Sequence, residues 1–144
     1  MSDKRRVANV ILRDQEGRIL LQHRTDDAEF FPGMWGNFGG HMNPGETPEQ
    51  AATRELKEEL DVEPHEITFI KKFEFPEDGH VLEQYVFTAP LEYTVDQLRK
   101  QQIEGKDLGL FDREGIKKLN IIDSDREIAQ YLFGKGRLKL PAHS

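Results

Sequence analysis

Cysteine is absent from this chain of 144 residues. Without a thiol the chain cannot form a thiolate zinc site, an iron–sulfur centre or a cysteine nucleophile, and nothing in it indicates an oxidising compartment. Serine occurs only as Ser2, Ser124 and Ser144, none of them within a Gly-x-Ser-x-Gly sequence. A serine nucleophile is therefore not expected either.

Long apolar runs are also missing. No stretch approaches the roughly 20 apolar residues that cross a bilayer. The apolar run Val7–Leu12 is short and interrupted by Asn9, so it predicts a strand and not a signal peptide. We therefore expect a cytoplasmic protein with no membrane partner.

Positive charge is scarce, because 20 basic residues face 27 acidic ones and give a net charge of −7. The chain lacks the basic footprint that duplex nucleic acid requires, so no such partner is expected. The negative charge is concentrated in residues 46–63, which carry seven acidic and two basic side chains. A concentrated acidic segment suggests a cation site, whereas a diffuse one would only favour solubility.

Apolar-rich runs and turn signals predict one α/β domain spanning residues 1–144. Two antiparallel strand pairs are expected, Val7–Arg13 with Arg18–Arg24 and Glu66–Phe75 with Val81–Leu91. The other expected elements are a strand and irregular loop in Trp35–Gly45, a helix from Thr47 to about Leu60, and helices at Asp112–Leu119 and Ser124–Phe133. This order predicts a mixed sheet whose faces are covered by helices.

The predicted helix after Thr47 carries three glutamates close together. Glu55 and Glu59 lie one turn apart on one face, with Glu58 beside them. Arg54 can offset one of these charges, and a divalent cation could offset the rest. Oxygen ligands without cysteine favour Mg²⁺ or Mn²⁺ over zinc, and Mg²⁺ is commonly shared with substrate phosphates. Taken alone, these residues fit a solvated helix face better than a cation site.

The spacing across Gly40–Val62 is more specific. It reads glycine, five residues, Glu46, seven residues, Arg54-Glu55, an aliphatic residue, any residue, Glu58-Glu59, and an aliphatic residue after Asp61. This pattern resembles the signature of the Nudix hydrolases, which use divalent metal to hydrolyse nucleoside diphosphates linked to another group. The resemblance implies a Nudix-type α/β/α sandwich with a mixed β-sheet and a small-molecule nucleotide substrate. The order of elements extends it over most of the chain.

One defined position departs from that signature. Asp61 stands where the family usually has glycine, directly after the helix, a place that requires a left-handed backbone. Aspartate tolerates that conformation better than most residues. We therefore expect a small loss of stability and no loss of activity.

The resemblance also implies roles for individual residues. Glu55, Glu58 and Glu59 are similar to the family's metal-binding carboxylates, and the carbonyl of Gly39 is often a further ligand. Glu55 could instead be the base that activates water. The expected cofactor is Mg²⁺, with Mn²⁺ as a substitute. Glu46 and Arg54 resemble a structural ion pair that braces the loop against the helix.

Residues outside the signature give weaker signals. Relatives often place an acidic residue in a later loop, where it binds metal or acts as the base, and Glu104 matches that pattern better than Asp107. Arg24 could contact a phosphate, or simply be an exposed arginine. Trp35 could stack on a nucleobase, or pack within the loop or core.

Three function classes remain. The leading hypothesis is a pyrophosphohydrolase of the mutator-type or nucleotide-sugar type. An isomerase similar to isopentenyl diphosphate isomerase is less favoured, because that chemistry uses a cysteine and this chain has none. A non-catalytic nucleotide-binding module is the third, although such modules typically lose signature glutamates and here none is lost.

Overall fold

A computed structural model describes residues 3–143 of the chain, and side chains from residue 4 to residue 134. Residues 1, 2 and 144 of the predicted domain lie outside the described residues. The elements in chain order are β1 (Asp3–Arg13), β2 (Ile19–His23), β3 (Trp35–Gly36), β4 (Gly39–His41), α1 (Pro48–Leu60), β5 (Thr68–Glu77), β6 (His80–Pro90), α2 (Val95–Gln101), β7 (Asp107–Phe111), α3 (Arg113–Lys117) and α4 (Asp123–His143).

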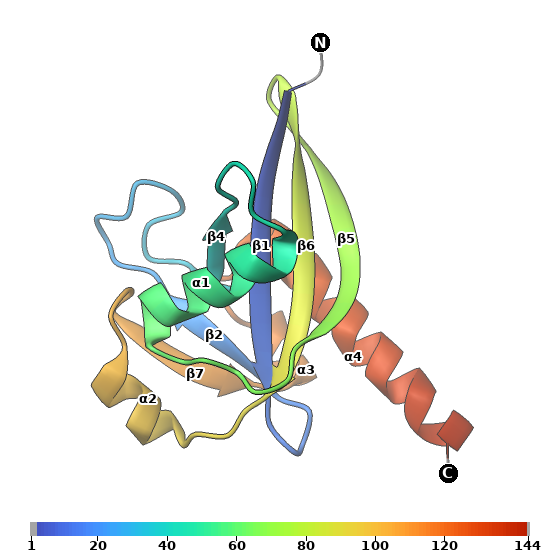
Figure 1. Cartoon of the computed structure of the whole chain (residues 1–144). Helices are drawn as coiled ribbons and strands as arrows, with labels where there is room; N and C mark the ends of the chain where they lie inside the picture. Colours follow the sequence, from blue (N-terminus) through green and yellow to red (C-terminus); the bar gives the residue numbers. More distant parts are fainter. Residues whose placement is uncertain (1–2, 144) are drawn as a thin grey trace.

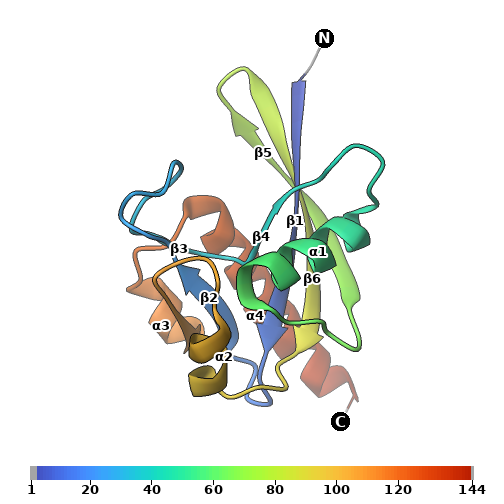
Figure 2. The ribbon, with the colours of Figure 1, turned by 60° about the vertical axis from the view of Figure 1, so that its left-hand side comes forward.

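The sheet is mixed, as the sequence predicts. β1 pairs in parallel with β6 from Asp3 opposite His80 to Arg13 opposite Pro90, and the other pairings are antiparallel. Figures 1 and 2 show α1 crossing one face of the sheet while α4 lies behind the other. The predicted α/β/α sandwich is confirmed.

β1 holds two parts of the sheet together. Its pairing with β2 is confined to Arg13 opposite Ile19, beside the turn. Nearer its start, from Val7 to Asn9, the same strand pairs with β4, while β2 pairs with β3 and β7. The two parts of the sheet are therefore paired with each other only beside the turn.

Alternating side chains build one core on each face. Ala8, Val10 and Leu12 of β1 pack with the buried side of α1, whereas Ile11 packs with α3 and α4. Leu20 of β2 belongs to the first core. A sheet covered on both faces has buried side chains at consecutive positions, which explains the apolar runs in the sequence.

Strong local signals define α1. Thr47 caps the helix, its hydroxyl accepting from the Gln50 N–H while the Gln50 side chain accepts from the Thr47 N–H, and Pro48 takes the first position. At the other end Asp61 has φ 57° and ψ 43°, a left-handed conformation, and its N–H donates to the Lys57 carbonyl. The expected backbone at Asp61 is confirmed.

Several elements differ from the sequence prediction. α2 and β7 lie between Leu91 and Asp112, where the sequence predicts no helix or strand, and a second short strand, β4, follows β3 within Trp35–Gly45. α4 extends to His143, beyond the predicted end at Phe133. Within the described residues, no helix combines the length and apolarity that crossing a membrane requires.

Candidate functional site

Arg54 of α1 connects the loop before the helix to two of the helix glutamates. Its Nε and Nη2 donate to the Glu46 carboxylate at 2.7 and 3.0 Å, and Nη2 also donates to the His41 carbonyl at 2.9 Å. Its Nη1 donates to Glu55 at 2.8 Å and to Glu58 at 3.1 Å. The guanidinium lowers the pKa of Glu46. The structure thus brings together the ion pair that the sequence predicted and places it against the acidic face.

Glu59 lies at the buried end of that face, with only 6% of its surface exposed. Its Oε1 accepts a hydrogen bond from the Gly39 N–H at 2.8 Å. Burial raises the pKa of Glu59 to about 10, and the neighbouring carboxyl of Glu104, through a hydrogen bond and its charge, adds to the rise. Glu59 is therefore in contact with Gly39, which precedes it in the sequence, and with Glu104, which follows it.

The loop that carries Glu104 is fastened to the end of α1. The N–H groups of Ile103 and Glu104 donate to the Glu59 carbonyl at 2.9 and 3.1 Å, and the Gln22 side chain donates to the Glu104 carbonyl at 3.0 Å. Asp107 is placed elsewhere, because its carboxylate accepts from Arg99 at 2.9 Å. Of these two acidic residues, the structure brings only Glu104 to Glu59.

Glu55 completes the cluster. Burial raises its pKa, the contact with Arg54 opposes that rise, and the charges of Glu58 and Glu104 add to it. Glycine beside it keeps this carboxylate in place, because a Cβ added at Gly40 would lie 2.4 Å from the Glu55 Oε1 and push the carboxylate aside.

The donor set fits a hard divalent cation. All available ligand atoms are oxygens, and burial raises the pKa of both Glu55 and Glu59. Among the described side chains, however, no three acidic, histidine or cysteine groups are already arranged as a metal site. Arg54 binds one oxygen of Glu55 and one of Glu58, so the second oxygen of each carboxylate has no bond to the guanidinium.

The acidic cluster opens into a cavity of about 420 Å³. Gly39, Glu55, Glu59 and Glu104 line it, and so does Arg24, whose Nε donates to the Phe30 carbonyl at 2.8 Å. Glu58 is exposed beside Arg54 and is not among the lining residues. The predicted metal and catalytic residues therefore lie in or beside one cavity.

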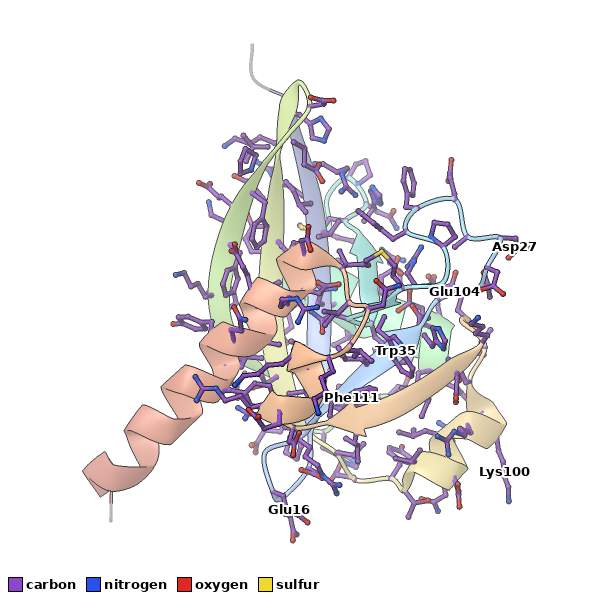
Figure 3. All side chains as sticks on the ribbon, turned by 180° about the vertical axis from the view of Figure 1, so that it is seen from behind. Glu16, Asp27, Trp35, Lys100, Glu104 and Phe111 are labelled. Carbon is purple, nitrogen blue, oxygen red and sulfur yellow. The ribbon has the colours of Figure 1, made fainter. Side chains whose placement is uncertain are left out.

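Trp35 is not brought to this cavity. Its ring stacks on the His23 ring at a centroid distance of 4.4 Å and meets the edge of Phe111 at 4.9 Å (Figure 3). It packs against the core that α3 and α4 cover. The packing interpretation of Trp35 fits these contacts better than base stacking does.

The sequence prediction missed a group of polar side chains in the same cavity. Asn9, Asn37, Gln84 and Asp125 are each less than 9% exposed and are hydrogen-bonded to one another. The one sequence signal was polar residues inside apolar strands, at positions 9 and 84. Asp125, two residues into a helix, looked like an ordinary acidic residue of a first turn.

Comparisons with known proteins agree on the family. A family model described as the NUDIX domain matches residues 3–132. The chain is 47% identical over 65 residues to the nucleoside triphosphatase NudI of Enterobacter sp. (strain 638), a match that covers 45% of each chain. It is also 47% identical over 60 residues to an isopentenyl-diphosphate delta-isomerase of Streptomyces avermitilis, covering 41% of this chain and 30% of that one. The matched segments thus span less than half of either relative.

A solved structure extends the likeness over the whole fold. The MutT protein from Methanosarcina mazei Go1 superimposes with a TM-score of 0.79 and covers 94% of this chain and 96% of its own. Because only 18% of the residues are identical, this similarity shows the fold alone.

Proposed function

This chain belongs to the Nudix hydrolase family, and from that premise we propose that it hydrolyses a pyrophosphate bond in a nucleoside triphosphate or another nucleoside diphosphate-linked compound. The observation that carries the proposal is the convergence of Glu55, Glu59 and Glu104 in one cavity. An acidic cluster in a cavity suits an anionic phosphate substrate only when a cation joins them.

The residues that would hold Mg²⁺ or Mn²⁺ are Glu55, Glu58, Glu59 and the carbonyl of Gly39. When bound, such a cation offsets the charge of the diphosphate and lowers the pKa of water, so no covalent nucleophile is needed. The absence of cysteine agrees with this chemistry. Arg54 positions Glu55 and Glu58 and anchors the loop through Glu46.

Proton removal from the attacking water falls to Glu104 or Glu55. Glu104 is exposed on a loop that lines the cavity, so its carboxylate can approach from the substrate side. Glu55 is partly buried on the helix and lines the same cavity. Arg24 lies on the same cavity and is the candidate contact for a substrate phosphate.

An isomerase is the second candidate, because the identity to the Streptomyces avermitilis enzyme, 47% over 60 residues, equals the 47% identity to the triphosphatase over 65 residues. Against it stands the lack of any cysteine. Isopentenyl diphosphate incubated with the protein and Mg²⁺ should remain unchanged. Its conversion to dimethylallyl diphosphate would replace the hydrolase proposal.

The direct test is a substrate panel of nucleoside triphosphates, ADP-ribose, nucleotide sugars and dinucleoside polyphosphates, with Mg²⁺, separating phosphate from pyrophosphate release. We expect hydrolysis that a chelator abolishes while the circular dichroism spectrum persists, because a core of this size folds without metal. Full turnover in metal-free buffer would contradict the mechanism.

Glu59→Gln removes a charged ligand at nearly constant volume. We expect the rate to fall about 100-fold or more, because a neutral amide is a weaker ligand for a cation. Stability in metal-free buffer should change little, because burial and Glu104 already keep the Glu59 carboxyl protonated there. Mg²⁺ should raise the melting temperature of the parent protein and not that of Glu59→Gln. The exposed Glu66→Gln is the matched control and should behave as the parent does. A Glu59 variant that unfolds yet keeps its specific activity would make Glu59 structural.

A further inference from the structure

Four ionisable side chains outside the acidic cluster meet where the start of β1 lies beside the β5–β6 hairpin (Figure 1). They are Arg5 of β1, His41 of β4, Glu77 of β5 and His80 of β6. Arg5, His41 and Glu77 line the cavity that holds the acidic cluster. The proposed hydrolysis gives none of these side chains a task.

Arg5 keeps part of its hydrogen-bonding capacity. A guanidinium has five N–H donors. The Arg5 Nε and Nη2 donate to the Glu77 carboxylate at 3.2 and 2.9 Å, and Nη1 lies 3.4 Å from the His41 Nε2. One N–H therefore remains on each terminal nitrogen, and two parallel N–H groups of this kind bind phosphate oxygens in pairs. The Arg5 side chain is 33% exposed, so a ligand in the cavity can reach it.

Basic groups outnumber acidic ones in this cluster. Glu77 serves both Arg5 and His80, and its pKa is lowered chiefly by the hydrogen bond from Arg5. Glu77 thus stays ionised and fixes the position of the guanidinium. His41 is exposed and, among the described side chains, has no acidic partner. Its contact with Arg5 is longer than an ordinary hydrogen bond and is easily replaced by a stronger acceptor.

The distance of this pair from the acidic cluster is set by β4. The Gly39 N–H donates to Glu59, and His41 follows two residues later, about 7 Å along the strand and on the same face. Arg5 and His41 also line an adjoining cavity of about 610 Å³, together with Lys4 and Arg6. The pair therefore lies between two open spaces, one of which contains the acidic cluster.

We propose that Arg5 and His41 bind a second phosphate of the substrate, a phosphate monoester on the sugar of the nucleotide whose pyrophosphate is hydrolysed. The proposal rests on the proposed function, since it assumes a nucleotide with its pyrophosphate at the acidic cluster. A single sugar separates the two phosphates of such a nucleotide, which suits the short step along β4. The two remaining N–H groups of Arg5 take two phosphate oxygens, whereas a sugar hydroxyl in the same place offers no charge.

Binding is tested with nucleotides that contain no pyrophosphate bond and therefore survive incubation with the protein. AMP, adenosine 2′,5′-bisphosphate and adenosine 3′,5′-bisphosphate are titrated by calorimetry in the presence of Mg²⁺. We expect one of the bisphosphates to bind about tenfold or more tightly than AMP, because hydrogen bonds between charged groups contribute at least that much. Equal affinity for all three would overturn the inference. Inorganic phosphate that binds as tightly as the bisphosphate would make this a site for a free anion and overturn the substrate assignment.

The variants assign the preference to the two side chains. Arg5→Gln should bring the affinity for the bisphosphate to within about twofold of that for AMP. His41→Gln should lose several-fold of the preference while retaining the backbone carbonyl that accepts from Arg54. Arg18→Gln is the matched control, because Arg18 also pairs with a carboxylate, that of Asp14 at 2.7 Å, but is not among the residues that line the cavity. It should keep the preference of the parent protein.

Arg5→Lys guards against a variant that does not fold. Lysine retains a positive charge beside Glu77 but has no paired N–H groups, so the preference should fall several-fold. A preference that is unchanged in folded Arg5→Gln or Arg5→Lys protein would overturn the inference.

Substrates that contain a pyrophosphate bond separate this inference from the proposed function. CoA and dephospho-CoA differ by a 3′-phosphate, and NADPH and NADH differ by a 2′-phosphate. We expect kcat/KM to be about tenfold higher for the phosphorylated member of the pair that matches the preferred bisphosphate. Hydrolysis without a preference in either pair would leave the proposed function standing and overturn the inference. A bisphosphate preference that Arg5→Gln removes, without hydrolysis of any compound of the substrate panel, would refute the proposed function and leave the phosphate site standing.

Discussion

At the scale of single residues, two acidic side chains remote in sequence share one environment. The loop after α2 donates two backbone N–H groups to the carbonyl of Glu59, and this contact brings the Glu104 carboxyl beside the Glu59 carboxyl. Asp107 is only three positions further along but is held by Arg99 and by its neighbour's N–H. Glu104 and Asp107 are therefore close in the sequence but lie in different surroundings.

Glu104→Gln and Asp107→Asn make a matched pair. If Glu104 accepts the proton from water, Glu104→Gln should lower kcat about 100-fold while KM changes little, because an amide cannot take the proton. Asp107→Asn should leave kcat within about twofold and cost some stability through the lost pairing with Arg99. Steady-state kinetics decide. The reverse order would transfer the role to Asp107, and full activity of both variants would leave Glu55 as the base.

At the scale of elements, α1 carries most of the candidate site and ends in a strained residue. Asp61 has φ 57°, where an ordinary side chain costs about 1–2 kcal/mol. Its long contact with Lys57, at 3.8 Å and exposed, offsets little of that cost. The end of α1 is therefore less stable with aspartate at position 61 than it would be with glycine there.

Asp61→Gly should stabilise the protein by about 0.5–1 kcal/mol, the relief of strain exceeding the entropy that glycine adds to the unfolded chain. Asp61→Ala keeps the Cβ without the polar side chain and should be less stable than the parent. Urea unfolding monitored by circular dichroism measures both, and activity should be unchanged. A glycine variant no more stable than the alanine variant would show that the backbone is unstrained.

The elements also show what the sequence could predict. α1 was predictable because its signals are local: Thr47, Pro48 and the spacing of Leu56 and Leu60. α2 has the same kind of cap, with Thr94 and Gln97, but only one buried side chain and no clear period. The parallel pairing of β1 with β6 has no local signature, since no turn connects the two strands.

The same distinction applies to the candidate site. Glu55, Glu58 and Glu59 follow from helical spacing, and the family resemblance assigned their chemistry. The group of buried polar side chains around Asp125 could not be predicted, because the burial of Asp125 depends on Asn37 and Gln84, which lie 88 and 41 positions away. Its hydrogen-bond directions exist only once strands β1 and β6 and helix α4 have met.

At the scale of the whole molecule, a buried carboxylate ties strands β1, β5 and β6 together. The Glu83 side chain is 1% exposed and lies 3.0 Å from Arg6, 3.2 Å from Lys4 and 3.6 Å from Lys72. Burial alone would raise its pKa, but the hydrogen bonds from Arg6 and Lys4 and the nearby charges prevail and lower it. Glu83 therefore stays ionised in the folded protein below the pH at which it would be protonated in the unfolded chain.

This linkage predicts part of the acid sensitivity. A lowered carboxyl pKa contributes stability that is present above its ordinary value of 4.5 and is lost as pH falls through the folded value. Glu83→Gln should be less stable than the parent at pH 6, and its free energy of unfolding should decline less between pH 6 and pH 3. The exposed Glu74→Gln on β5 should retain the parent's pH slope. Equal slopes for the parent and Glu83→Gln would contradict the prediction.

The parallel pairing of β1 with β6 has a consequence for the time course of synthesis. β1 ends at Arg13, but its principal partner begins only at His80, so the apolar segment Val7–Leu12 waits while 67 further residues are translated. At translation rates of roughly 5–20 residues per second, that wait lasts about 3–13 s. During it, the strand that later joins both parts of the sheet is a nascent hydrophobic segment without its partner, and the decisive step in folding comes late, when residues 80–90 arrive.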